Sequence, residues 1–280
     1  MKLLFFFLLV SSFGCKPKHP VSVLPAKPTS ACEKDYSEFY KNDVLDFRIV
    51  FGYKDARPAR YVGDRYERAY LIQKLLNFGF ERVVNSEEDF SYSFLGPNRR
   101  PKKIKLKLVA SSAGPDDDEN RKDPYQKWMT MHAQEVFLTG LRSSDLVFYY
   151  GHSRDGGGPD FAPPRLGARQ HVDYGWYLKH SPGLKNMISG LKANHGRVLP
   201  VLGLYSCVSD KLFAKQVLAV SPKTQLMLSK VLLYYIDALN GMMESLTDVI
   251  EMKCQADFHP PGTELISGRD LKSLPRDSHP

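Results

Sequence analysis

Residues 145–153 read DLVFYYGHS, an uninterrupted apolar run that stops at a glycine and a histidine. A second run of the same kind, VLPVLGLYSCVS at residues 198–209, stops at a cysteine. Apolar runs of this length are typical of strands that are buried on both faces, as in a parallel sheet. The two runs therefore predict central strands of an α/β domain.

The sequence on either side alternates between the two kinds of element. Apolar residues at helical spacing, ended by Gly79, predict a helix over residues 64–78. By the same criteria we expect strands at 46–53, 80–84, 90–95, 103–110 and 224–229, and helices at 125–141, 183–194, 213–219 and 230–250. This alternation predicts a three-layer α/β sandwich, with a mostly parallel sheet and helices on both faces.

The net charge of +8 has one concentrated source, RRPKKIKLK at residues 99–107. Such a run is typical of a solvated edge strand, where lysines also discourage pairing with other chains. The alternation over residues 90–95 and 103–110 predicts strands at an edge or in a hairpin. No nucleic-acid-binding motif accompanies the basic run, so we expect no nucleic-acid partner.

The chain starts like an export signal. Lys2 precedes the apolar run LLFFFLLV at residues 3–10, which is too short to span a membrane, and small residues lead to Cys15. This segment resembles a bacterial lipobox, which implies diacylation of Cys15 and a lipid anchor in the periplasm or at the outer membrane. Ordinary cleavage at the same bond is the alternative.

These features divide the chain into four parts: a signal segment at 1–15, a tether and entry segment at 16–45, an α/β domain at 46–255 and a polar tail at 256–280. Residues 16–31 of the second part are rich in Pro and Lys, as is typical of an extended tether. With Cys15 assigned to lipid, three cysteines remain in an oxidising compartment. We expect Cys32 and Cys254 to pair and Cys207 to stay free, the alternative being three buried thiols.

The two apolar runs place reactive residues at strand ends, because His152 follows one run and Cys207 the other. In parallel sheets, functional sites form at the carboxyl ends of the strands. An imidazole beside a thiol activates it as a nucleophile. Cys207 also opens the predicted helix in which residues 213–219 lie, and the N–H groups at a helix start favour a thiolate. The spacing therefore predicts a His152/Cys207 dyad.

YYGHS and LYSCVS resemble the corresponding segments of the caspase-like cysteine peptidases, which include metacaspases, legumains and gingipains. The resemblance implies a caspase-like fold, with His152 as the general base and acid and Cys207 as the nucleophile. It also implies an oxyanion hole formed by the backbone N–H groups of Ser153 and Cys207. Tyr205 stands where metacaspases have a substrate-binding aspartate.

A Gly- and Pro-rich loop follows His152. Its charged residues Arg154, Asp155 and Asp160 are candidates for selecting a substrate side chain, the alternative being a plain connection. His171 and Asp173 follow farther along, but no metal-binding spacing supports a metal site there. GHSRD at residues 151–155 also approaches the nucleophile elbow G-x-S-x-G, which leaves a serine hydrolase using Ser153 as an alternative.

The sequence therefore predicts an exported cysteine-type peptidase that acts on a peptide or protein substrate. It needs no cofactor, and it touches the membrane through its N-terminal lipid only. The alternative from another class is a catalytically silent envelope lipoprotein that uses the same fold for binding.

Overall fold

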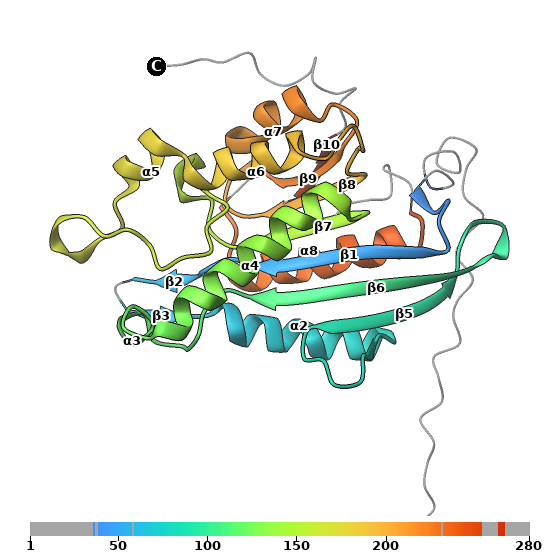
Figure 1. Ribbon diagram of the computed structural model, residues 1–280, viewed down its shortest axis with the longest axis horizontal. Coiled ribbons are helices and arrows are strands. Elements are labelled where there is room, and N and C mark those ends of the chain that lie inside the picture. Colours follow the sequence, from blue (N-terminus) through green and yellow to red (C-terminus); the bar gives the residue numbers. More distant parts are fainter. Residues whose placement is uncertain (1–35, 37–38, 58, 231, 254–262, 267–280) are drawn as a thin grey trace, which may run out of the picture.

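The structure, a computed structural model, describes residues 36, 39–57, 59–230, 232–253 and 263–266 (Figure 1). Its strands are β1 (Val44–Phe51), β2 (Asp55–Ala56), β3 (Tyr61–Val62), β4 (Glu81–Arg82), β5 (Asp89–Leu95), β6 (Pro101–Ala110), β7 (Leu146–Tyr150), β8 (Val201–Tyr205), β9 (Gln225–Ser229) and β10 (Thr263–Ile266). Its helices are α2 (Asp64–Phe78), α3 (Asp117–Asn120), α4 (Pro124–Ser143), α5 (Tyr174–His180), α6 (Pro182–Lys192), α7 (Ser209–Val220) and α8 (Tyr235–Ile250).

The central sheet has eight strands in the order β10-β9-β8-β7-β1-β6-β5-β4. Neighbouring strands from β9 across to β6 run parallel, whereas β10, β5 and β4 join the sheet in antiparallel pairs. The predicted mostly parallel sheet is confirmed.

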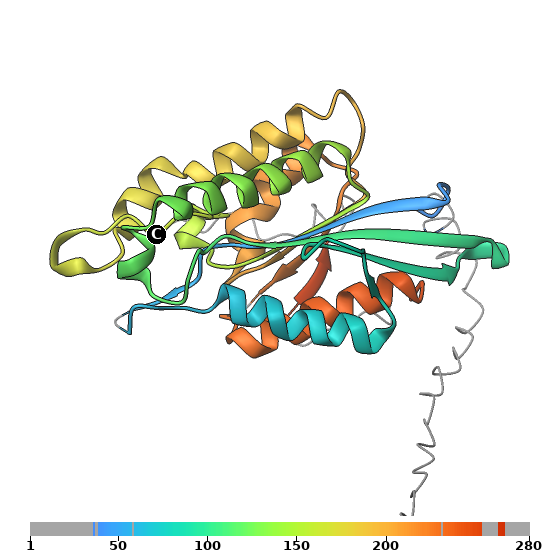
Figure 2. The ribbon, with the colours of Figure 1, turned by 60° about the horizontal axis from the view of Figure 1, so that its bottom comes forward.

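Helices cover both faces of this sheet (Figure 2). On one face α2 and α8 pack over a core that contains Phe47 and Phe148. On the other, α4, α6 and α7 pack over a second core that contains Val147 and Leu204. The three layers predicted from the alternating elements are therefore present.

Local signals set the helix ends. The side chain of Asp123 accepts a hydrogen bond from the backbone N–H of Tyr125, and Pro124 occupies the first turn of α4, where its missing N–H costs nothing. Gly79 ends α2 in the left-handed conformation at φ 115°, which glycine adopts without steric cost. Both helices begin and end within two residues of the predicted bounds.

Of the two placements expected for the strands at 90–95 and 103–110, the hairpin is confirmed, whereas the edge position of the basic run is wrong. The hairpin of β5 and β6 is present, but β1 pairs with the other side of β6, so β6 lies inside the sheet. Its lysines at 103 and 105 are exposed because the helices of that face do not extend over them. The alternating exposure of β6 thus comes from an uncovered sheet face and not from a position at the sheet edge.

Three strands end together at one edge of the sheet. Phe51 of β1 pairs with Tyr150 of β7, which in turn pairs with Tyr205 of β8. The residues that follow these three strands therefore gather at this carboxyl edge, where sites in parallel sheets form.

Candidate active site

His152 and Cys207 leave the carboxyl edge at equivalent positions. Each lies two residues beyond the last paired residue of its strand, Tyr150 for one and Tyr205 for the other. The N–H of Gly151 still donates to the carbonyl of Tyr205 at 3.3 Å, so the two strands stay together up to the site. The two strands are therefore neighbours, which is the condition for His152 and Cys207 to emerge at the same sheet edge.

The ring of His152 has a defined tautomer. Its Nε2 lies 3.0 Å from the backbone carbonyl of Asp55. A carbonyl can only accept, so Nε2 carries the hydrogen and Nδ1 keeps a free lone pair. Burial, together with the positive charge of Arg154, lowers the pKa of His152 to about 4. The imidazole is therefore neutral at pH 7, as a general base must be before it acts.

Cys207 is a partly exposed free thiol beside the start of α7. Its Sγ lies 3.9 Å from the carbonyl oxygen of Leu233. The next residue, Val208, is left-handed at φ 45° and ψ 36°, which is rare for a β-branched side chain. Strained residues of this kind cluster at functional sites, where the surrounding fold holds them in place.

The backbone supplies unpaired donors beside both residues. The N–H groups of Ser153 and Cys207 donate to no acceptor within the described part of the chain. Pre-placed N–H groups of this type stabilise the oxyanion that forms during acyl transfer. The two groups that the resemblance implies for an oxyanion hole are thus available for that role.

Lys54 also reaches this edge, and the sequence analysis missed it. Its ammonium donates to Glu67 Oε1 at 2.6 Å and to the hydroxyl of Tyr150, and it lies 3.6 Å from the ring centroid of Tyr235. Burial lowers the pKa of Lys54 to about 8 against the opposing charge of Glu67, and Cys207 also interacts with it electrostatically. The sequence does carry a signal for it. Lys54 and Asp55 directly follow the apolar strand predicted at 46–53, just as His152 and Cys207 follow the two other apolar strands.

Arg154 and Asp160, predicted to contact substrate, instead form a buried ion-pair network. The Arg154 side chain is 1% exposed and donates to Asp55 Oδ1 at 2.5 Å and to Asp160 Oδ2 at 3.1 Å. Asp160 also accepts from the hydroxyl of Tyr177 at 2.9 Å. Burial alone would lower the pKa of Arg154, but the two carboxylates raise it. These side chains are already paired, so their role is to hold the loop after β7.

The other two predicted substrate contacts differ from each other. Tyr205 is buried and its hydroxyl lies against the sulfur of Met227, which places it in the core. Asp155 is exposed, with φ 50° and ψ 41°, and stays available to a ligand.

The context of Ser153 does not match a nucleophile elbow. Its side chain is buried, and the chain continues into a short 3₁₀ turn at Arg154–Gly156 and not into an α-helix. An elbow serine needs the strand-turn-helix arrangement to expose its hydroxyl.

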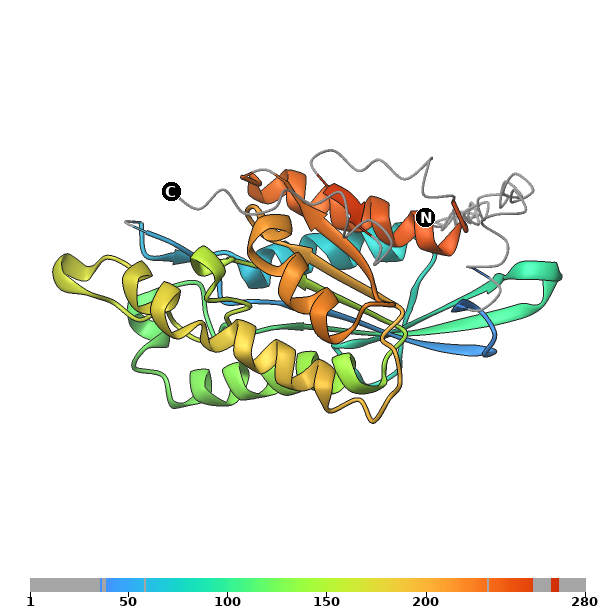
Figure 3. The ribbon, with the colours of Figure 1, turned by 90° about the horizontal axis from the view of Figure 1, so that it is seen from above.

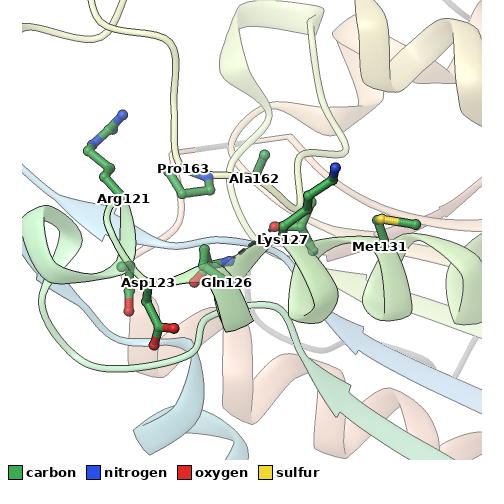
Figure 4. Close-up of a pocket in the computed structure, with 9 residues that line it drawn as sticks. Arg121, Asp123, Gln126, Lys127, Met131, Ala162 and Pro163 are labelled. Carbon is green, nitrogen blue, oxygen red and sulfur yellow. Dashed lines mark hydrogen bonds between the residues drawn. The ribbon is translucent and has the colours of Figure 1, made fainter.

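A separate pocket of about 440 Å³ lies where α4 begins (Figure 4). It is lined by Asn120, Arg121, Asp123, Gln126, Lys127, Thr130, Met131, Ala162 and Pro163. Gln126 is held in place because its amide donates to the carbonyl of Ser111 at 2.8 Å. The pocket includes neither residue of the dyad.

Several predictions made from the sequence lie outside the described residues: the export signal, lipidation of Cys15, and the disulfide between Cys32 and Cys254. Within the described ranges, no helix is long and apolar enough to cross a membrane. No group of three metal-ligating side chains occurs in that same part of the chain.

No protein-family model matches the chain, and no curated protein sequence matches it.

Proposed function

We propose that this protein is a caspase-like cysteine-type peptidase that uses His152 and Cys207 to hydrolyse peptide bonds. The observation that carries this proposal is the register of β7 and β8. It puts an imidazole and a free thiol at equivalent positions after paired residues of adjacent parallel strands. The resemblance of YYGHS and LYSCVS to the caspase-like peptidases supports the same roles.

In the proposed reaction, the thiol of Cys207 gives its proton to Nδ1 of His152, and the sulfur attacks the substrate carbonyl carbon. The N–H groups of Ser153 and Cys207 hold the negative oxygen of the tetrahedral intermediate. His152 then returns the proton to the leaving amine as the peptide bond breaks. Water, deprotonated by His152, hydrolyses the thioester and restores the thiol.

Lys54 supports the first step of this reaction. Its buried positive charge interacts with Cys207 and would stabilise the negative charge that develops on the sulfur as the proton leaves. The hydrogen bond from His152 to the carbonyl of Asp55 leaves Nδ1 as the proton acceptor.

We further propose that the enzyme is exported and anchored in the bacterial cell envelope through a lipid on Cys15. The signal-like residues 1–15 and the tether that follows support this location. The active-site edge would then act on peptides or proteins within the envelope.

One observation favours the silent lipoprotein instead. The low pKa of His152, caused by burial and by Arg154, disfavours the imidazolium that must form when the imidazole takes a proton. A fold that keeps the dyad but cannot protonate His152 would bind peptides without cleaving them.

Alkylation of Cys207 separates the two functions. Iodoacetamide modification would be followed by site-resolved mass spectrometry from pH 5 to pH 10, in the wild type, in His152→Ala and in the control His171→Ala, which removes an exposed histidine. For the peptidase we expect His152→Ala to react at least about tenfold more slowly at pH 7. The control should match the wild type.

The same experiment can contradict the proposal. If the wild type and His152→Ala show one shared pH profile, with the midpoint near pH 8.5 of an ordinary thiol, His152 does not activate Cys207. Cleavage of a mixed peptide library, lost in Cys207→Ala, then tests the reaction itself.

A further inference from the structure

One face of the sheet is covered only along half of its length. Strand register puts Val44, Ser93, Leu95, Lys103 and Lys105 on the same face. Farther along the same strands this face carries Val50 and Val109, which are buried under α4. We call the uncovered half, together with Arg99 and Arg100 at the adjacent hairpin tip, the amino-end face. Figure 3 shows the hairpin of β5 and β6 extending beyond α4 and α6.

The amino-end face has a surplus of positive charge. Arg99, Arg100, Lys103 and Lys105 are all exposed, and none of them makes an ion pair with another described residue. The nearby carboxylates are already neutralised: Asp43 pairs with Lys102 at 2.9 Å, and Asp46 with Arg48 at 2.7 Å. Four cations therefore remain to attract an anionic partner.

Apolar side chains lie among these cations. Val44 is 47% exposed and sits beside Lys103 in the register, and Leu95 is 52% exposed at the end of β5. Exposed apolar groups surrounded by lysine and arginine are typical of surfaces that rest at the boundary between lipid headgroups and acyl chains. A partner recognised by charge alone would not require them.

The described chain enters the sheet at the same end. The chain enters β1 at Val44, beside Lys103, and residues 1–35 precede the first described residue. After Cys15 those residues include four more lysines, Lys16, Lys18, Lys27 and Lys34, against two carboxylates, Glu33 and Asp35. A bilayer that meets the amino-end face would therefore also lie near the start of the domain.

We propose that the amino-end face docks onto an anionic phospholipid bilayer. β1 has eight residues, so its two ends lie roughly 26 Å apart at about 3.3 Å per residue. Docking at the amino end holds the carboxyl edge, with His152 and Cys207, away from the lipid and open to the surrounding space. This orientation does not depend on whether the dyad is catalytic.

The test is flotation of the full chain with vesicles. A Cys15→Ser background removes the acyl chain, and the vesicles are either phosphatidylcholine alone or phosphatidylcholine with about one third phosphatidylglycerol. The test variant is Lys103→Glu/Lys105→Glu. The control is Lys179→Glu/Lys185→Glu, which makes the same charge change at exposed positions on α5 and α6.

We expect the Cys15→Ser protein to bind the phosphatidylglycerol vesicles more tightly than the neutral ones, and less tightly as salt is raised. A lysine at an anionic surface contributes a factor of about five in partitioning, so the test variant should lose at least about 25-fold. The control should lose far less. Unchanged thermal melting of both variants establishes that they fold.

Three outcomes would overturn the proposal. Equal binding to both vesicle types shows that charge plays no part. Equal loss of vesicle binding in the test and control variants shows that binding depends on the net charge of the protein and not on the amino-end face. If the test variant instead loses binding only to a double-stranded DNA probe, the partner of the amino-end face is a nucleic acid.

Discussion

The backbone carbonyl of Asp55 accepts a 3.0 Å hydrogen bond from Nε2 of His152. The carboxylate of the same residue accepts from Arg154 at 2.5 Å. Asp55 thus contacts two residues of the loop after β7 through two different groups. Burial is the largest influence on the pKa of Asp55 and would raise it, but the charge of Arg154, its hydrogen bond and the other neighbouring groups together keep that pKa below its ordinary value. The ion pair holds in place the carbonyl that orients the imidazole.

Replacing Arg154 should destabilise the fold strongly. Arg154→Met leaves the carboxylates of Asp55 and Asp160 buried without their partner, and breaking such pairs costs about 3–5 kcal/mol. Urea unfolding measures the change in the free energy of unfolding. In the control, Arg165→Met removes an exposed arginine 3.4 Å from Asp173 and should cost less than about 1 kcal/mol. Equal effects of the two substitutions would show that the buried network contributes little.

Acidification should weaken the fold through His152. Its folded pKa of about 4 lies below its unfolded value of 6.5, so the unfolded chain binds the proton more readily between these values. The stabilisation is fully present above pH 6.5 and is lost as the pH falls toward 4, by up to roughly 3 kcal/mol.

The titration of Asp64 changes the stability of the fold in the opposite direction over an overlapping pH range. Burial raises the pKa of Asp64 to about 6, so its contribution to stability is full below pH 3.8 and is lost as the pH rises to 6. The test is urea unfolding of the wild type and of His152→Gln at pH 7 and at pH 4.5. Both proteins contain Asp64, so its contribution drops out of the difference between them. The wild type should lose more stability than the variant. A constant difference between the two proteins would mean that His152 titrates normally in the fold.

The charge of Lys54 should control the reactivity of Cys207. Lys54→Met removes a buried cation that interacts with Cys207 and can stabilise negative charge developing on its sulfur, so alkylation of Cys207 at pH 7 should slow by roughly three- to tenfold. Glu67→Gln removes the carboxylate that holds the pKa of Lys54 near 8, so Lys54 should lose part of its charge at pH 7 and alkylation should slow as well. Site-resolved mass spectrometry measures both rates. Unchanged rates in both variants would show that the charge of Lys54 does not act on Cys207.

Gly203 should tolerate no side chain. A Cβ at this position in β8 would lie 2.6 Å from a ring carbon of Phe148 and 2.7 Å from one of Tyr205. Gly203→Ala should therefore cost about 1–3 kcal/mol by overpacking the core. As a control, Gly175→Ala in α5 meets its nearest atom at 3.7 Å and should stabilise the helix slightly. Thermal melting compares the two, and a stable Gly203→Ala protein would contradict the packing described.

Local pattern was sufficient to predict most elements but not the position of β6 in the sheet. The alternation in KKIKLKLVA reports which side chains meet water, and it reads the same on an uncovered face of an interior strand as on an edge strand. Only the pairing of β1 with β6 distinguishes the two cases. The sequence therefore predicted the strand and its exposed side chains correctly and its place in the sheet wrongly.

The sequence by itself determined the two apolar strands, because burial on both faces of a sheet requires continuous apolar runs. The direction of the chain along these strands then places His152 and Cys207 at the carboxyl edge. Tertiary structure decided what surrounds these two residues. Lys54 and Asp55 come from the segment that follows β1, and Arg154, predicted to meet substrate, pairs with two carboxylates instead. Charge pairing acts through space between residues about 100 positions apart, such as Asp55 and Arg154, and leaves no periodic trace along the chain.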